Sequence, residues 1–316
     1  MMNRPCLTKE PNLHVQNQHA SYIRPIKNIF VRMKKQILFL LLVFACAATS
    51  LAQDGPIRVI VFGAHPDDCD LTAGGTAIKF VQMGHKVKFV SMTNGDAGHQ
   101  STGGGALAKR RMAEAQEAGR RFGVEYTVLD NHDGELMPTL ENRLKVIREI
   151  RNWNADIVIT PRPDDYHPDH RYTSILVQDA SFMVIVPNVA PDVPALKKNP
   201  VFFYPNNTEP DIAIDIDNEL TQKIYAASAH ESQFFEWLPY IQGTLDKVPA
   251  GKEERLLFLR KRFTPPNDAV RSCLKKWYDE PKASKIMCAE AFQVSKFGRQ
   301  PGKEELLSLF PMLKKQ

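Results

Sequence analysis

The sequence lacks a hydrophobic run long enough to cross a membrane comfortably. Residues 37–48 form an apolar stretch of twelve residues, whereas a transmembrane helix needs about 20. The stretch follows Lys34 and Lys35, and small residues stand after it at Ser50 and Ala52. A short basic segment, a short apolar segment and small residues in that order are typical of a cleaved secretory signal.

We therefore expect a leader in residues 1–52. Its signal peptide would cover residues 33–52 and be cleaved before Gln53, so that the mature protein is secreted or periplasmic. Met33 directly precedes the two lysines, which makes residues 1–32 either a mis-assigned start or an extension. A retained N-terminal anchor is the alternative. Once the leader is removed, no stable membrane span is expected.

An excess of positive charge is also missing from the expected mature chain. The full sequence carries 41 basic and 36 acidic residues, a formal net charge of +5. Seven of the basic residues and one of the acidic residues lie in the leader, which leaves 34 basic and 35 acidic residues. Charge therefore gives no reason to expect a nucleic-acid partner. The composition, 43% hydrophobic and 24% charged, is sufficient for a buried core.

Cysteine is scarce beyond the leader, where only Cys69, Cys273 and Cys288 remain. In a secreted protein Cys273 and Cys288 could form a disulfide. Their spacing fits two free buried thiols equally well. Cys69, beside the proposed site, would be the unpaired cysteine if that disulfide forms.

Residues 53–233 show a regular alternation of strand and helix patterns. The expected strands are residues 57–62, 86–92, 124–129 and 156–160, and the expected helices are residues 71–83, 106–122, 140–153 and 172–184. Strands that alternate with helices of this length predict an α/β fold with a Rossmann-like, doubly wound and mostly parallel sheet.

The pattern changes after this alternation. Residues 187–210 are rich in proline and predict a loop region, interrupted by a short apolar piece at residues 201–204. Residues 212–216 alternate with aspartates, as an edge strand would. From Phe234 onward the regularity is lost, and amphipathic helices are expected near residues 253–262 and 303–313. We interpret residues 234–316 as a helical C-terminal extension that covers part of the core domain.

Two of the expected strands are each followed by histidines and carboxylates. Residues 57–62 lead into Ala64-His65-Pro66-Asp67-Asp68, and residues 156–160 lead into a loop that ends in His167-Pro168-Asp169-His170. In an open α/β sheet, ligands bind beyond the carboxyl ends of the strands. These side chains are therefore expected to share one crevice and to form a metal site.

His65, Asp67 and Asp68 stand at the first of these strand ends. His65 and Asp68, three residues apart across a tight turn, can both face one ion. Asp67 then points elsewhere, and a free carboxylate beside a metal-bound water is a general base. On its own, this motif would indicate a structural His65 and two aspartates that cap the next helix. The second motif argues against that interpretation.

His167, Asp169 and His170 stand at the second strand end. One histidine can ligate the metal, while the other donates to a developing oxyanion or protonates the leaving group. Asp169 lies between them and can orient an imidazole. Zinc hydrolases take three protein ligands of these kinds and leave one position for water, so the set predicts a metal-dependent hydrolase.

The two motifs together resemble those of the LmbE/PIG-L family of zinc-dependent N-deacetylases, and the resemblance covers about residues 57–233. It implies an enzyme that removes an acetyl group from an N-acetylated amino sugar or glycoconjugate, with zinc (Zn2+) as its cofactor. It implies three metal ligands: His65, Asp68 and His170. Asp67 would be the general base, and His167 would be the positively charged stabiliser of the tetrahedral intermediate, supported by Asp169.

Weaker features of the resemblance suggest substrate-binding residues. Asp96 lies in the loop after the second strand, where relatives place residues that contact substrate. Arg111, at the head of the next helix, could bind a sugar hydroxyl, and His230 lies in a segment close to the site in relatives. Each has a plainer alternative: Asp96 as a turn former, Arg111 as a solvated helix residue and His230 as a packing residue. Relatives commonly have Glu where this chain has Cys69, from which we expect altered tuning of the site.

Two other functions remain open at this level. The protein could be a zinc amidase that acts on a different amide, with the extension reshaping the pocket, or a sugar-binding relative without activity. The intact set of histidines and carboxylates favours an enzyme, because a binding protein needs no base beside the metal. The same nitrogen and oxygen ligands accept several divalent ions, and neither the substrate's identity nor the oligomeric state follows from the sequence.

Overall fold

The structure of the protein is a computed structural model that describes residues 55–313. The leader predicted in residues 1–52, with its signal peptide and cleavage site, lies outside the described residues. The described residues from Pro56 onward form one compact unit. Within them, no helix combines the length and the apolar composition that a bilayer crossing requires.

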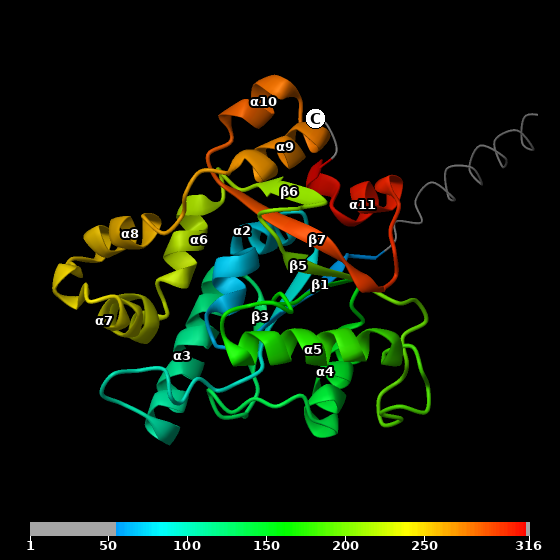
Figure 1. The fold of residues 1–316 in the computed structure, drawn as a ribbon, viewed down its shortest axis with the longest axis horizontal. Helices are drawn as coiled ribbons and strands as arrows, with labels where there is room; N and C mark the ends of the chain where they lie inside the picture. Colours follow the sequence, from blue (N-terminus) through cyan, green and yellow to red (C-terminus); the bar gives the residue numbers. More distant parts are fainter. Residues whose placement is uncertain (1–54, 314–316) are drawn as a thin grey trace, which may run out of the picture. The chain divides into compact units, whose positions relative to one another are not determined.

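A seven-stranded mixed sheet forms the centre of the fold, in the order β3-β2-β1-β4-β5-β7-β6 (Figure 1). The strands are β1 (Arg58–Gly63), β2 (Lys86–Ser91), β3 (Glu125–Val128), β4 (Ile157–Ile159), β5 (Val201–Pro205), β6 (Ile212–Asp215) and β7 (Ala289–Gly298). Strands β1 to β5 pair in parallel, and β7 is antiparallel to both β5 and β6. The α/β fold with a mostly parallel sheet is therefore confirmed, and β6 is the expected edge strand.

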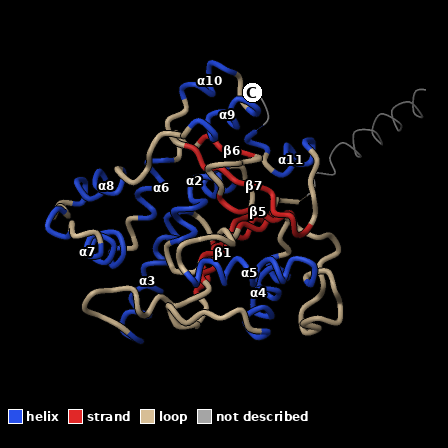
Figure 2. The backbone as a smooth tube through the Cα atoms, in the orientation of Figure 1, coloured by secondary structure: helices blue, strands red, loops and turns tan. Residues whose placement is uncertain are grey.

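Helices cover both faces of the sheet (Figure 2). They are α2 (Asp68–Gln82), α3 (Gly104–Phe122), α4 (Leu140–Trp153), α5 (Pro168–Met183), α6 (Leu220–Ala227), α7 (Leu238–Ile241), α8 (Lys252–Arg260), α9 (Asp268–Trp277), α10 (Glu280–Lys285) and α11 (Lys303–Leu309). A π-helix (Ser232–Trp237) leads into α7, and short 3₁₀ turns occur at Leu245–Lys247 and Pro311–Leu313.

The core has two halves because alternate residues of a strand face opposite sides of a sheet. Val59 and Val61 of β1 belong to one buried cluster with residues of α2 and α3. Ile60 and Phe62 belong to a second cluster with residues of α4 and α5. The carboxyl end of β1 is thereby fixed between two packed layers, and the residues that follow it start from a rigid position.

The C-terminal segment contains a strand that the sequence did not predict. The helices expected near residues 253–262 and 303–313 are present as α8 and α11, but β7 lies between β5 and β6 in the sheet. Glu290 of β7 accepts hydrogen bonds from two backbone N–H groups in the middle of α2, those of Gly75 (2.8 Å) and Thr76 (2.7 Å). Lys223 completes this buried contact, with its Nζ 2.6 Å from Glu290 Oε1. The segment is therefore part of the sheet and holds α2.

The three cysteines of the described residues are free and buried. Of the two alternatives for Cys273 and Cys288, the structure has the free thiols. Burial raises the pKa of the Cys273 thiol to about 11. Cys69 lies directly behind the end of β1, where its Sγ is 3.3 Å from the Val61 carbonyl oxygen.

Candidate active site

The end of β1 turns sharply into α2 and fixes the first group of polar residues. Asp67 and Asp68 donate their backbone N–H groups to the His65 carbonyl, at 2.8 and 3.2 Å. Gly63 is required by the tightness of this turn, because a Cβ there would lie 2.7 Å from Asp68 Cβ. The Asp68 Oδ2 atom accepts from the backbone N–H groups of Ala64 (2.9 Å) and His65 (2.8 Å). The turn thus sets the direction of the Asp68 carboxylate.

The loop after β4 brings in the second group at the start of α5. His167 caps this helix: its Nδ1 accepts from the Asp169 backbone N–H at 3.2 Å, and Pro168 occupies the first turn. Because Nδ1 is an acceptor, a neutral His167 ring carries its proton on Nε2. Burial lowers the pKa of His167, and the neighbouring histidines lower it further.

Three donor atoms, one on each of the predicted ligands His65, Asp68 and His170, converge at nearly equal spacing. His65 Nδ1 lies 3.4 Å from Asp68 Oδ2 and 3.3 Å from His170 Nε2, and the remaining pair, His170 Nε2 and Asp68 Oδ2, is 3.3 Å apart. Atoms bound to zinc at 2.0–2.2 Å in a tetrahedron are about 3.3–3.6 Å from one another. The donor set and its spacing therefore fit a zinc ion.

Two further groups of donor atoms include His65. Those of His65, His167 and His170 all lie within 4.8 Å of one another, and those of His65, Asp133 and Asp169 form a second such group. His65 belongs to both groups because its two ring nitrogens face opposite ways. Either group could hold a metal ion.

The far side of the His65 ring faces two carboxylates. Its Nε2 lies 3.0 Å from Asp133 Oδ1 and 3.4 Å from Asp169 Oδ2. Burial alone would lower the pKa of His65, but the surrounding carboxylates outweigh burial and raise it well above the usual value. A carboxylate behind a metal-binding histidine fixes the orientation of its ring. The predicted support of His167 by Asp169 stays a prediction, and the Asp169 carboxylate lies beside His65.

Asp133 is a site residue that the sequence did not predict. It lies in an Asp-Gly pair after β3, and Gly134 donates its backbone N–H to Asp169 Oδ2 at 2.7 Å. Its position after a third parallel strand of the same sheet could have indicated a site residue. Asp-Gly is also a common turn sequence, so that signal is weak.

Arg111 is buried, with 2% of its surface exposed, and lies against Asp67. Its Nη2 donates to Asp67 Oδ1 at 3.0 Å, and its Nη1 donates to the Gly95 carbonyl at 3.0 Å. Burial raises the pKa of Asp67, and the charge of Arg111 opposes the rise without cancelling it. Arg111 is therefore not a solvated helix residue. It lines the cavity and holds one carboxylate oxygen of Asp67.

Asp96 and His230 lie one layer behind the cavity. The Asp96 carboxylate accepts the Asp133 backbone N–H at 3.0 Å and contacts His132 Nδ1 at 2.6 Å. His230 is fully buried, with its Nε2 3.0 Å from Asp70 Oδ1. Neither side chain lines the cavity, so their substrate-binding roles stay predictions. Through the first of these contacts Asp96 fixes the loop that carries Asp133.

The cavity has a volume of about 380 Å³, within the usual range for small-ligand sites. Six of the residues predicted for the site line it: His65, Asp67, Asp68, Arg111, His167 and His170. Further lining residues that the sequence did not single out are Asp133, Tyr166, Trp237, Leu238 and Ile241. Tyr166 stands at the mouth, with 85% of its surface exposed.

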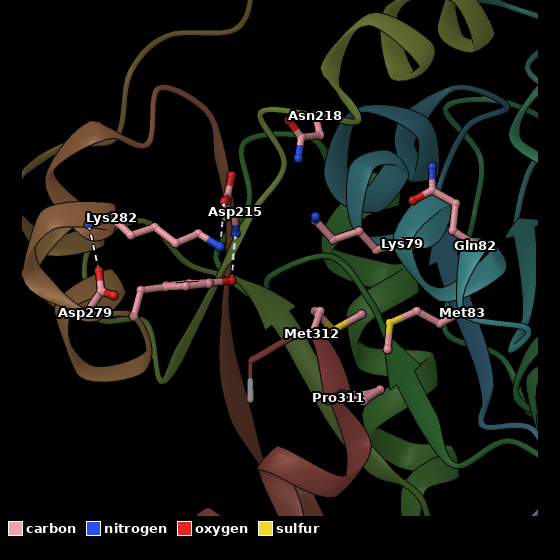
Figure 3. Close-up of a pocket in the computed structure, with 10 residues that line it drawn as sticks. Lys79, Gln82, Met83, Asp215, Asn218, Asp279, Lys282, Pro311 and Met312 are labelled. Atoms are coloured by element: carbon pink, nitrogen blue, oxygen red, sulfur yellow. Dashed lines mark hydrogen bonds and ion pairs between the residues drawn. The ribbon is translucent and has the colours of Figure 1, made fainter. Parts of the chain in front are cut away.

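A second cavity, of about 520 Å³, lies at the other end of α2 (Figure 3). Lys79 and Gln82 come from the end of α2, and Lys282 extends toward Asp215, with 3.7 Å between Nζ and Oδ2. Among the described residues, no histidine or cysteine lines this cavity. Its mixed charges offer no set of zinc ligands, so the chemistry favours the cavity at the end of β1.

Known proteins resemble this chain in sequence and structure. Residues 60–181 match the family described as PIG-L: GlcNAc-PI de-N-acetylase. The diacetylchitobiose deacetylase of Thermococcus kodakarensis is 32% identical over 202 aligned residues, and the match covers 58% of this chain and 75% of that protein. The N,N'-diacetylchitobiose deacetylase from Pyrococcus horikoshii is similar in structure, with a TM-score of 0.60 and 26% identity over 76% of this chain and 84% of its own.

A third neighbour shares the fold alone. The 4-carboxy-2-hydroxymuconate hydratase from Pseudomonas putida KT2440 has a TM-score of 0.56 and 18% identity, over 78% of this chain and 99% of its own. A hydratase with this fold shows that the fold by itself does not determine the reaction. The reaction has to be argued from the side chains of the cavity.

Proposed function

The chain belongs to the PIG-L/LmbE family of deacetylases, which are amide hydrolases, and we propose that it is a zinc-dependent enzyme. It would remove the acetyl group from an N-acetylated amino sugar in a glycan or glycoconjugate. The relative from T. kodakarensis, named for diacetylchitobiose, supports a saccharide substrate. The observation that carries the proposal is the 3.3–3.4 Å spacing of the three ligand atoms of His65, Asp68 and His170.

The zinc site would be built by these three residues, with Asp133 and Asp169 orienting His65 from behind. Bound zinc supplies a Lewis acid, which polarises the amide carbonyl and makes water a better nucleophile at neutral pH. Everything else in the reaction falls to side chains of this chain.

Asp67 is the proposed general base. Arg111 holds its Oδ1 at 3.0 Å, which leaves Oδ2 to take the proton from the attacking water. The raised pKa of Asp67, caused by burial, makes this carboxylate a stronger base than an exposed one. Arg111 therefore acts through Asp67 as a positioning residue.

His167 is the proposed donor to the oxyanion. Its Nδ1 is committed to the α5 cap, so the Nε2–H group is the one available to the cavity. We propose that this N–H group donates to the developing oxyanion, the stabilising role that the family resemblance implies. A donor aimed at the developing charge is the arrangement that stabilises a tetrahedral intermediate.

The test is amine release by the zinc-loaded protein from a panel of N-acetylated sugars. Wild type should release amine and acetate, and Asp67→Asn should retain zinc while losing at least about 100-fold in turnover. Asp68→Ala should lose zinc. Zinc binding without turnover on any N-acetylated sugar would contradict the substrate class, and a protein that binds no zinc would contradict the metal site.

A further inference from the structure

The candidate active site has two unlike walls. One wall carries the histidines and carboxylates already described. Another wall is formed by the π-helix Ser232–Trp237 and the first turn of α7, which contribute Gln233, Trp237 and Leu238. π-helical turns are rare and are frequently found at functional sites. Because Gln233 and Trp237 are four residues apart in the wide π-helix, both side chains reach the cavity.

The Trp237 indole has an unused hydrogen-bond donor. The other two tryptophans of the chain donate their indole N–H to carbonyl oxygens, Trp153 to Val59 at 2.8 Å and Trp277 to Asp211 at 2.9 Å. Among the described residues, no protein acceptor takes the Trp237 N–H. Its Nε1 points at Gly98 in the cavity lining, 3.7 Å from the position a Cβ would occupy there.

Gln233 provides an unused acceptor beside this donor. It is 3% exposed, and its Nε2 donates to the Gly98 carbonyl at 3.0 Å and to Ser232 Oγ at 3.2 Å. Within residues 55–313, its Oε1 accepts no hydrogen bond. Both residues line the cavity, where the hydroxyl groups of a ligand can pair with this donor and this acceptor.

The wall is held in place before any ligand binds. Glu236 accepts two hydrogen bonds from Arg110, at 2.8 and 2.6 Å, and lies 2.8 Å from His99 Nε2. The Trp237 ring stacks on Tyr240 with 6.0 Å between ring centroids and 20° between planes. A surface fixed in this way loses little entropy when it binds a ligand.

We propose that Trp237 and Gln233 form a subsite for the sugar unit attached to the acetamido sugar, so that the protein prefers an oligosaccharide to free N-acetylglucosamine. The inference rests on the proposed function and deepens it. A sugar ring has an apolar C–H face and a hydroxyl edge, which match an indole face with an N–H at its edge. An alkyl chain in the same place would leave the indole N–H and the Gln233 carbonyl without partners, which is unfavourable.

The experiment measures kcat and KM on three probes: N-acetylglucosamine, N,N'-diacetylchitobiose and the octyl glycoside of N-acetylglucosamine. Trp237→Ala should raise KM for the disaccharide about tenfold more than KM for the monosaccharide. Trp237→Phe keeps a ring and loses the N–H, and should fall between wild type and Trp237→Ala. The matched control is Tyr225→Ala, which removes a half-exposed aromatic residue of α6 outside the cavity and should leave the KM ratio unchanged.

Zinc content and thermal unfolding accompany each variant, and Trp237→Phe keeps the test valid if Trp237→Ala does not fold. Equal changes in KM for monosaccharide and disaccharide, or no change in either, would overturn the subsite while the proposed function stands. A larger loss on the octyl glycoside than on the disaccharide would also overturn it, in favour of an alkyl site. Failure of the proposed function shows separately, as no hydrolysis of any probe by the wild type.

Discussion

Asp133 should control zinc affinity although it is not one of the three proposed ligands. Its Oδ1 lies 3.0 Å from His65 Nε2, opposite the ring nitrogen that faces the proposed metal position. Removing a carboxylate from behind a metal-binding histidine typically weakens metal binding 10- to 100-fold, or about 1.4–2.7 kcal/mol. Asp169 Oδ2, at 3.4 Å from the same nitrogen, can take over part of this role, so Asp133→Ala should weaken zinc binding about 10-fold.

The assay is zinc competition against a chromophoric chelator at neutral pH. Asp133→Asn should lie between wild type and Asp133→Ala, since the amide oxygen can still accept from the ring without supplying charge. Asp130→Asn is the matched control: this exposed carboxylate lies on the same loop and contacts Asn94, at 2.9 Å, and not His65. Wild-type zinc affinity in Asp133→Ala would refute the proposed arrangement around His65.

Three further predictions concern charged side chains and their hydrogen-bond partners. Arg111→Ala should keep zinc and lose at least about 100-fold in kcat because Asp67 is no longer held; unchanged turnover would count against this role. Arg151→Ala should destabilise the fold by about 3 kcal/mol or more, because the five N–H groups of its buried guanidinium are shared among six carbonyl oxygens of residues 183–193. Urea unfolding measures the loss, and a loss under about 1 kcal/mol would contradict the prediction. Hydrogen bonds from Arg110 and then His99 lower the pKa of Glu236 below its usual 4.5. The contribution of Glu236 to stability is therefore present above pH 4.5 and is lost as the pH falls through the lowered pKa. Glu236→Gln should weaken the acid dependence of unfolding, and an unchanged pH profile would contradict this prediction.

The sequence was most informative where function depends on short segments. His65, Asp67 and Asp68 follow directly from one strand, and His167 and His170 from another, so their meeting in one cavity could be predicted from the parallel sheet alone. The buried strands were equally visible, because their apolar runs are local. The edge strand β6 could also be predicted, because its apolar residues alternate with aspartates.

The sequence was least informative where a residue's role is set by partners far along the chain. Arg111 was recognised, but its contact with Asp67 depends on how α3 packs against the end of β1. β7 was missed because Glu290 and Gln293 interrupt its apolar pattern, and the carboxylate of Glu290 is accounted for only by its contacts with α2 and Lys223. Trp237 carries no motif, and only the π-helix brings it to the cavity.

The central claim is that one zinc ion at His65, Asp68 and His170 makes this chain a deacetylase of N-acetylated sugars. The most direct measurement is amine release from N,N'-diacetylchitobiose by metal-free protein as zinc is added back in steps. The expected result is no activity without metal and a linear rise that ends at one zinc per chain. Full activity in the metal-free protein, or zinc binding to saturation without amine release, would contradict the claim.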